Sequence, residues 1–320
     1  MVSKEEVNWA YQLFLDRKPE NLNVVEEKAK IHSNIQELRK EFLNSEEFKK
    51  KNPICPVLSM SGTEPPMLIE NNLDLNDSNV NALFSHIQDV WEYLGQTEPH
   101  WSVTTQEQFK SYAIKENLSH FYESGFENAN TLFKSLDRNA IDQTSFTSCL
   151  EYGCGLGRVT WALSKKFERV IGYDISKSHL QCAKSYFASK GINNVELHHI
   201  SQPQEIRNFP KVDVVYSVIV LQHNPPSLIY LILQELIRAL NPGGIAFFQV
   251  PTYKMGYKFF LKDYLMEDHS NKEMEMHCLP QSEIFKIIHN ENAKVIEILE
   301  DDWQGLEYHS RSNTFIVQKE

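Results

Sequence analysis

The chain has 320 residues, of which 41% are hydrophobic, and this is enough for one large domain with a sizeable core and a second, smaller unit. The formal net charge is −11 at pH 7 and no long basic run is present, which argues against a nucleic-acid partner bound through its phosphates. No apolar stretch reaches the roughly 18 residues of a transmembrane helix, and the acidic N-terminus does not resemble a signal peptide, so we expect a cytoplasmic protein with free thiols.

The N-terminal part of the chain has the pattern of a small helical unit. Apolar residues recur at helical spacing from Val7 to Leu15, and Lys18-Pro19 interrupts that helix. Two further helices are predicted at residues 24–33 and 34–42. Residues 1–51 are therefore predicted to form a helical accessory module, with packing or homo-oligomerisation as its simplest role.

A composition change separates this module from the rest. Residues 52–67 are rich in proline and small residues, which predicts a linker. Residues 68–145 are predicted to be mainly helical, with apolar positions in helical register between 76 and 94. Residues 146–320 are predicted to carry the core sheet, so that the large domain covers 68–320.

The most informative stretch runs from Cys149 to Ser176 and reads as strand, glycine turn, helix and second strand. Gly153, Gly155 and Gly157 let the backbone turn sharply and approach a ligand closely. The helix that follows directs its N-terminal amides at that ligand. Asp174 ends the second strand, where a carboxylate suits the two hydroxyls of a ribose.

Beyond this stretch, strands alternate with helices, which indicates a doubly wound α/β sheet. Strands are predicted at 195–200, 212–221, 245–250, 293–300 and 313–318, and helices at 178–190, 226–240 and 281–290. The run 212–221 is apolar and β-branched throughout, as in a strand buried on both faces, and we expect it beside the first strand. Residues 251–280 interrupt the alternation with many aromatic side chains and are predicted to be a substrate-binding insertion.

The glycine motif resembles that of a known family. Glu151 opens the order E-x-G-x-G-x-G, whereas the dinucleotide-binding turn G-x-G-x-x-G would need its third glycine at Arg158. This form resembles motif I of the class I S-adenosylmethionine-dependent methyltransferases, and the N-P-G-G turn at 241–244 adds to the likeness. The resemblance implies a Rossmann-like sheet of seven strands with an antiparallel last hairpin. A dehydrogenase is a remote alternative.

The resemblance also implies S-adenosyl-L-methionine as cofactor, with Glu151 near its methionine part and Asp174 on its ribose. The segment before the motif often covers the cofactor in this family, and the residue after the third strand often contacts the adenine. The predicted cofactor contacts are Glu151, Gly153, Cys154, Gly155, Gly157, Arg158, Asp174, Ile175, Gln202, Ser217, Val218, Trp101 and Tyr122. For Trp101 and Tyr122, plain packing is the alternative.

Transfer of a methyl group to a hydroxyl usually needs a general base or a metal. His223, at the end of the predicted strand 212–221, is the preferred base, with capping of the next helix as the alternative, and His277 is the second choice. The predicted substrate contacts are Gln222, Tyr253, Tyr257 and His277. No carboxylates are expected to converge on one point, so no metal is predicted.

Several phrases, among them EYGCGLGR and SVIVLQHNPP, resemble a branch of the family associated with bacterial surface-polysaccharide biosynthesis, and AYQLFLDRKPE resembles a helical module found beside such enzymes. The implied activity is O-methylation of a sugar hydroxyl on a surface glycan or its precursor. Two alternatives stay open: a methyltransferase for a small metabolite with an oxygen or nitrogen acceptor, and a catalytically silent cofactor-binding assembly module.

Overall fold

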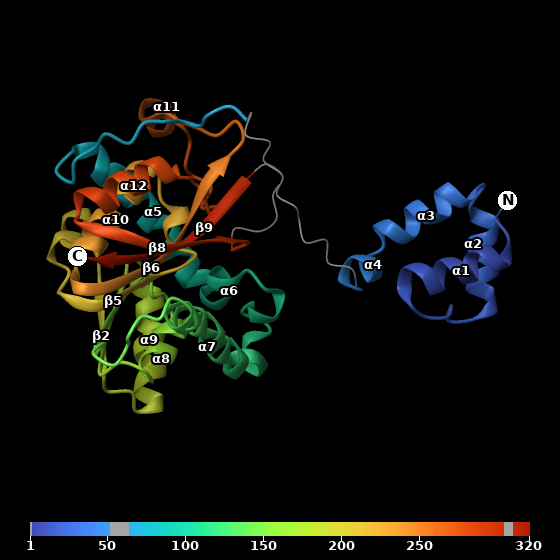
Figure 1. The fold of residues 1–320 in the computed structure, drawn as a ribbon, viewed down its shortest axis with the longest axis horizontal. Helices are drawn as coiled ribbons and strands as arrows, with labels where there is room; N and C mark the ends of the chain where they lie inside the picture. Colours follow the sequence, from blue (N-terminus) through green and yellow to red (C-terminus); the bar gives the residue numbers. More distant parts are fainter. Residues whose placement is uncertain (1, 52–63, 304–309) are drawn as a thin grey trace. The chain divides into compact units, whose positions relative to one another are not determined.

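The computed structural model describes residues 2–51, 64–303 and 310–320. The chain divides into two compact units, Met1–Ser59 and Met60–Glu320 (Figure 1). Most of the predicted linker lies outside the described residues. Among the described residues, no helix combines the length and the apolar character that crossing a bilayer requires.

The first unit is helical. Its helices are α1 (Lys4–Leu15), α2 (Leu22–Ile31), α3 (Ile35–Asn44) and α4 (Glu46–Lys51). A capping box begins α1, since the Ser3 hydroxyl accepts from the Glu6 amide while the Glu6 carboxylate accepts from the Ser3 amide. Val7, Tyr11 and Phe42 lie in the small core of this unit, so the predicted helical periodicity corresponds to its buried face.

The second unit is built on a sheet of seven strands. They are β2 (Ser148–Tyr152), β3 (Arg169–Asp174), β4 (Val195–His199), β5 (Val212–Ser217), β6 (Leu240–Lys254), β8 (Ala293–Asp301) and β9 (Ser310–Lys319). Their order is β4-β3-β2-β5-β6-β9-β8, and only β9 runs antiparallel to its neighbours. The predicted fold is confirmed, including β5 beside β2. The chain leaves β2 and β5 in opposite directions across the sheet, which places a ligand-binding crevice at their carboxyl ends.

Helices cover both faces of this sheet (Figure 1). The long helices are α5 (Ser78–Thr97), α7 (Ile114–Arg138), α9 (Lys177–Lys190), α10 (Pro226–Arg238) and α12 (Gln281–Asn290). The shorter elements are β1 (Leu68–Ile69), α6 (Pro99–Thr104), η1 (Glu107–Phe109), α8 (Arg158–Leu163), η2 (Pro203–Asn208), η3 (Leu221–His223), β7 (Lys258–Phe259) and α11 (Leu261–Met266). β1 and β7 pair in a separate parallel ribbon.

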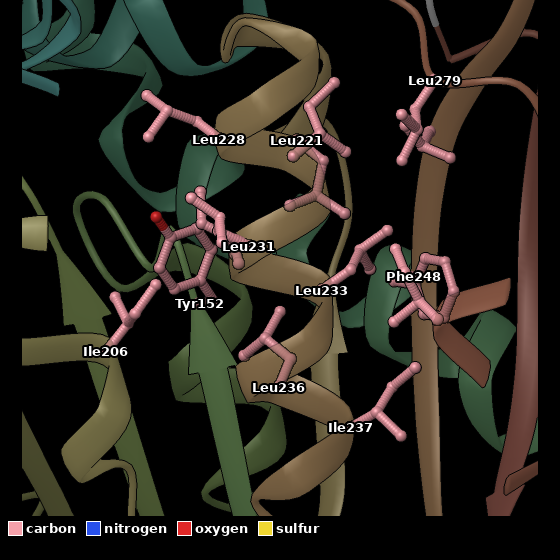
Figure 2. Close-up of a cluster of buried hydrophobic side chains, with 14 of the residues drawn as sticks. Tyr152, Ile206, Leu221, Leu228, Leu231, Leu233, Leu236, Ile237, Phe248 and Leu279 are labelled. Carbon is pink, nitrogen blue, oxygen red and sulfur yellow. The ribbon is translucent and has the colours of Figure 1, made fainter. Parts of the chain in front are cut away.

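Alternating side chains along the strands separate the core into two layers. Phe248 of β6 belongs to the layer with α5, α10 and α12, and its neighbour Phe247 belongs to the layer with α7 and α8. Figure 2 shows the first layer, where leucines of α10 such as Leu233 and Leu236 lie against the strands. Full burial of each such side chain is worth about 1.5–3 kcal/mol, so this layer fixes α10 on the sheet.

Several predicted boundaries were wrong, among them the start of β6, which lies at Leu240 instead of residue 245, so that residues 241–244 belong to the strand. β5 ends at Ser217 rather than at residue 221, because the chain leaves the sheet in a bend where Ile219 has a φ of 59°. An uninterrupted apolar sequence gives no sign of that exit. The sheet also continues into the predicted insertion, since β6 pairs with β9 as far as Lys254.

Helix α7 approaches α8 closely at Gly125. A Cβ at this position would lie 2.1 Å from the carbonyl oxygen of Arg158, far inside contact distance. The missing side chain therefore lets α7 pack against the first turn of α8. Arg158 then reaches Ser124 and Asn128 of α7 with its guanidinium group.

We expect Gly125→Ala to destabilise the protein by about 1–3 kcal/mol, as overpacking typically does. Alanine normally stabilises a helix by up to about 1 kcal/mol relative to glycine, but here the new methyl group must displace backbone. Urea unfolding measures the effect. Ser119→Ala, at an exposed position of α7, is the matched control. Equal or greater stability of Gly125→Ala would contradict the close approach.

Candidate active site

A cavity of about 420 Å³ opens at the carboxyl ends of β2, β3 and β5. Its walls come from α5, from the segment after α5, from the glycine turn, and from the chain after β5. The lining residues include Ile87, Trp91, Ser102, Val103, Thr104, Thr105, Asn128, Glu151, Tyr152, Gly153, Cys154, Gly155, Arg158, Val159, Asp174, Ile175, His179, Tyr216, Val218, Ile219, Val220, Gln222, His223, Asn224, Met274, Met276 and Trp303. Its volume lies in the range of small-molecule sites, roughly 300–1,000 Å³.

Backbone hydrogen bonds join the glycine turn to the end of β3. The amides of Gly153 and Cys154 donate to the Tyr173 carbonyl at 2.8 and 3.0 Å. The Gly155 amide donates to Asp174 Oδ2 at 2.7 Å, and the Ser176 amide donates to Asp174 Oδ1 at 2.8 Å. Each carboxylate oxygen has a further lone pair, so Asp174 is held in place and can still accept from two hydroxyls.

Glu151 lies on the cavity wall and is only 4% exposed. Thr160 Oγ1 donates to Glu151 Oε2 at 2.5 Å. Burial raises the pKa of Glu151 to about 8, against the lowering effect of the Thr160 hydrogen bond. The carboxyl group is therefore largely protonated at pH 7, and a cation placed beside it would draw the proton off.

Two residues that line the cavity each have a buried polar atom without a hydrogen-bond partner among the described residues, namely Arg158 Nε and Thr104 Oγ1. The Arg158 Nη1 atom donates to Asn128 Oδ1 at 2.5 Å and to Ser124 Oγ at 3.1 Å. Burial lowers the pKa of Arg158. An unsatisfied buried donor costs about 1–3 kcal/mol, so both atoms would gain from a polar ligand in the cavity.

Most of the predicted cofactor residues line this cavity: Glu151, Gly153, Cys154, Gly155, Arg158, Asp174, Ile175 and Val218. Gly157 does not. It begins α8 with a φ of 77°, and a Cβ there would lie 2.4 Å from Phe187 Cζ. Ser217 does not either, since its buried hydroxyl donates to the Tyr152 carbonyl within the sheet. Both residues shape the fold beneath the cavity.

The predicted lid residues and the adenine contact also lie outside the lining set. Tyr122 is buried and stacks on Tyr186 with ring centroids 3.4 Å apart. Trp101 has the Lys110 ammonium over its ring, while its neighbours from residue 102 to 105 line the cavity. Gln202 is exposed before η2. For Tyr122, the structure therefore agrees with the alternative of plain packing and not with a cofactor contact.

His223 and Gln222 both line the cavity just after β5. The His223 Nδ1 atom donates to the Glu275 carbonyl at 2.8 Å, and because a carbonyl can only accept, the proton is on Nδ1 and Nε2 carries a lone pair. Burial lowers the pKa of His223 to about 4, so the ring is neutral at pH 7. Trp91 packs edge-on against it.

Buried amides hold Gln222 in position. Gln249 Nε2 donates to Gln222 Oε1 at 3.1 Å and to Ser312 Oγ at 2.7 Å. Gln249 Oε1 accepts from the Ile219 amide at 3.0 Å, which fixes the bend after β5. Gln222 Nε2 lies 3.4 Å from His223 Nε2. The Gln222 side chain on the cavity wall is therefore fixed to β6 and β9 through Gln249.

The other predicted substrate residues are engaged elsewhere. Tyr257 Oη and His277 Nδ1 are 2.8 Å apart, and His277 Nε2 is 2.8 Å from Glu275 Oε2. The Tyr253 hydroxyl donates to the Pro65 carbonyl. None of these three side chains lines the cavity. Both ring nitrogens of His277 have partners at 2.8 Å and this side chain does not line the cavity, whereas His223 lines it and its Nε2 has only the Gln222 amide nitrogen at 3.4 Å, so His223 is the better placed of the two predicted bases.

Sequence reasoning missed much of the apolar wall, notably Trp91, Met274, Met276 and Trp303. Trp91 was visible as an aromatic residue beside a periodic helix. The two methionines alternate about Glu275 in a segment without regular structure, and Trp303 lies in the chain between β8 and β9. No local pattern distinguishes such residues, because only the tertiary fold brings them to the cavity.

Comparisons with known proteins agree with this geometry. Residues 149–244 match the family model described as a methyltransferase domain. A ubiquinone biosynthesis O-methyltransferase of Pseudomonas fluorescens (strain Pf0-1) is 31% identical over 101 residues, which are 31% of this chain and 42% of that protein. One from Histophilus somni (strain 2336) is 27% identical over 125 residues, 35% of this chain and 52% of that protein. The chain spans about half the length, or less, of these curated relatives.

Among solved structures, magnesium protoporphyrin IX methyltransferase from Synechocystis PCC 6803 with bound SAH has a TM-score of 0.51 at 14% identity, covering 74% of this chain and 99% of that one. At this identity the likeness concerns the fold. The chain has the Rossmann-like α/β fold of the class I S-adenosylmethionine-dependent methyltransferases, with a cavity at its glycine turn. The segment that matches the methyltransferase family model runs from β2 to the start of β6.

The residues of the cavity fit S-adenosylmethionine. Asp174 offers acceptors to ribose hydroxyls, and the cavity is also lined by the polar residues Arg158 and Thr104. Glu151 offers a carboxylate to a cation. The chemistry of the donor set thus agrees with a ligand that carries a ribose, a carboxylate and positive charge.

We expect Asp174→Asn to weaken cofactor binding by at least about tenfold. The amide has only one acceptor oxygen, whereas the carboxylate has two, which accept from backbone amides and from the ribose hydroxyls. Titration calorimetry with S-adenosylhomocysteine measures the affinity. Glu168→Gln, an exposed acid just before β3, is the matched control. Unchanged affinity of Asp174→Asn would remove Asp174 from the ribose contact.

Glu151 generates a pH prediction. With a pKa of about 8 it is mainly protonated at pH 7, and a positively charged ligand lowers this pKa on binding, so binding releases a proton. The association constant for S-adenosylmethionine should therefore rise by up to about tenfold per pH unit between pH 6 and 8 and level off above. Calorimetry in buffers of different ionisation enthalpy counts the protons. In Glu151→Gln the release and the slope should vanish; a slope that persists would assign the proton to another group.

Proposed function

We propose that this protein is an O-methyltransferase that transfers the methyl group of S-adenosylmethionine to a hydroxyl of a small, largely apolar acceptor, with His223 as general base. The observation that supports this proposal most directly is the position and tautomer of His223. It lines the cavity beyond β5, and its Nδ1–H is bound to the Glu275 carbonyl, so Nε2 can accept a proton. The name of the matching relatives, O-methyltransferases, supports an oxygen acceptor.

The bound cofactor supplies an electrophilic methyl group on a sulfonium. What the chain supplies is alignment, because displacement at a methyl group needs the acceptor oxygen in line with the leaving sulfur. His223 Nε2 takes the hydroxyl proton as the new carbon–oxygen bond forms. Gln222, held by Gln249, lies beside the same nitrogen and helps to orient the acceptor.

The cofactor end of the cavity is assigned by charge. Asp174 takes the ribose hydroxyls, and Glu151 lies near the positively charged methionine part. The Arg158 guanidinium is the complement of the carboxylate of that part. The sulfur joins the ribose to the methionine part, so in this proposal its methyl group projects from the middle of the bound cofactor toward Gln222 and His223.

The acceptor end favours an apolar or aromatic molecule over a sugar. Its wall contains Trp91, Met274, Met276 and Trp303, whose side chains offer ring faces and thioethers. The tyrosines expected to stack on a sugar, Tyr253 and Tyr257, are outside the cavity. A glycan acceptor therefore rests on the sequence resemblance alone and becomes one arm of the acceptor test.

We expect His223→Ala to lower kcat by about 10²–10⁴-fold, the usual worth of general base catalysis, with cofactor affinity changed less than about twofold. Labelled-methyl transfer measures kcat and calorimetry measures the affinity. His289→Ala, an exposed histidine of α12, is the control. Wild-type turnover in His223→Ala would eliminate this base.

The acceptor is found by offering S-adenosylmethionine with an isotope-labelled methyl group together with hydroxylated aromatics, nucleotide-sugars, glycan extracts and amines. Label in the hydroxylated aromatics supports the proposal. Label confined to the glycan fraction overturns the acceptor class but keeps the transfer reaction, and label confined to amines overturns the oxygen acceptor. Cofactor binding without any transfer favours a silent binding module.

A further inference from the structure

Behind the acceptor wall lies a cluster of ionisable side chains that the methyl-transfer site does not use. His86 of α5 meets His269 and Glu275 of the chain that follows α11, and one ligand atom from each lies within 4.8 Å of the other two. His86 is far in the sequence from His269 and Glu275, which lie six residues apart in one segment. The fold alone brings them together, which explains why no metal was expected from the sequence.

The distances within the cluster suit a shared cation. His86 Nε2 is 2.8 Å and His269 Nδ1 is 3.5 Å from the same oxygen, Glu275 Oε1. Ligand atoms bound tetrahedrally to zinc at about 2.0–2.1 Å are roughly 3.3 Å apart, and the two observed distances bracket this value. The third pair of ligand atoms, on His86 and His269, lies within 4.8 Å.

The orientation of His269 is set from outside the cluster. Its Nε2 lies 2.7 Å from the Tyr264 carbonyl, which can only accept, so Nε2 carries the proton. The other ring nitrogen, Nδ1, then faces the carboxylate of Glu275. Metal-bound histidines commonly donate their second ring nitrogen to a carbonyl in this way.

The second oxygen of Glu275 is held as well. Tyr264 Oη donates to Glu275 Oε2 at 2.6 Å, and His277 Nε2 lies 2.8 Å from the same oxygen. These contacts aim Oε1 at the two histidines. The side chains of His86, His269 and Glu275 are 11%, 23% and 23% exposed, so an ion can reach them and keep a water ligand.

We propose that His86, His269 and Glu275 form a binding site for a first-row divalent transition metal, with zinc as the fitting ion. Two imidazole nitrogens and one carboxylate oxygen are ligands that zinc accepts. The ion has a structural role: it fastens the segment around Glu275 to α5. This site takes no part in the methyl-transfer step and stands independently of the proposed reaction.

The consequence for the cavity follows from the neighbours of Glu275. Met274 and Met276 line the acceptor wall, and the Glu275 carbonyl accepts from His223 Nδ1. An ion on the Glu275 side chain therefore fixes both the wall and the orientation of His223. Without an ion, the same groups form a hydrogen-bonded cluster that holds the segment less firmly.

The test measures metal content of the full chain after dialysis against micromolar zinc and then against metal-free buffer. We expect about one zinc per chain by mass spectrometry, a rise in Tm with zinc, and the absorption bands of tetrahedral cobalt when cobalt replaces it. His269→Ala and His86→Gln should each weaken zinc binding by at least about 100-fold and abolish the rise in Tm. His289→Ala should bind zinc as the wild type does.

Several results would overturn the site. One is a wild-type chain that retains no zinc. Another is equal retention by His86→Gln, His269→Ala and the wild type, which would mean an adventitious ion only. Glu275→Gln keeps the size of the side chain and removes only the charge. A wild-type Tm in metal-free buffer shows that this variant is folded. If the folded variant still binds zinc tightly, the Glu275 carboxylate is not a ligand and the proposed site is wrong.

Discussion

The cofactor end of this protein depends on the hydrogen bonds that tie the glycine turn to the end of β3. Asp174 accepts from the amides of Gly155 and Ser176, and the Tyr173 carbonyl accepts from Gly153 and Cys154. These bonds satisfy donors that the turn would otherwise leave buried and unpaired, at a cost of about 1–3 kcal/mol each. β2 and β3 pair in parallel along the whole length of β2. A ligand that contacts the turn between them is therefore positioned relative to the whole sheet.

Local patterns predicted the parts of the fold that local physics determines. The α12 range of 281–290 and the strand from residue 293 follow from periodicity and from flanking turn residues. The glycine turn could be predicted with Glu151 and Asp174 because its close backbone approach needs particular residue types. The end of β5 could not, since Val218 to Val220 are as apolar as the strand itself, and the bend at Ile219 is held by Gln249 of β6, a contact that only the tertiary fold makes.

The acceptor end could not be read from the sequence because its residues meet only through the tertiary fold. Met274, Met276 and Trp303 carry no motif, and each would be an ordinary core residue elsewhere. The aromatic run around Tyr257 is conspicuous in the sequence, yet its hydroxyl is used by His277. Likewise, a search for converging carboxylates misses a cluster in which one glutamate and one histidine of the segment after α11 meet a histidine of α5.

His223 depends both on a feature that local sequence predicts and on a contact that only the tertiary fold makes. Its position after β5 follows from the sheet and could be predicted, whereas its tautomer is set by the Glu275 carbonyl, which belongs to the segment that forms the acceptor wall. A change in that segment therefore alters the acceptor wall and the direction of the Nε2 lone pair together. In the proposed reaction, acceptor selection and proton removal are thus coupled through one stretch of backbone, while the cofactor end, held by β2 and β3, stays as it is.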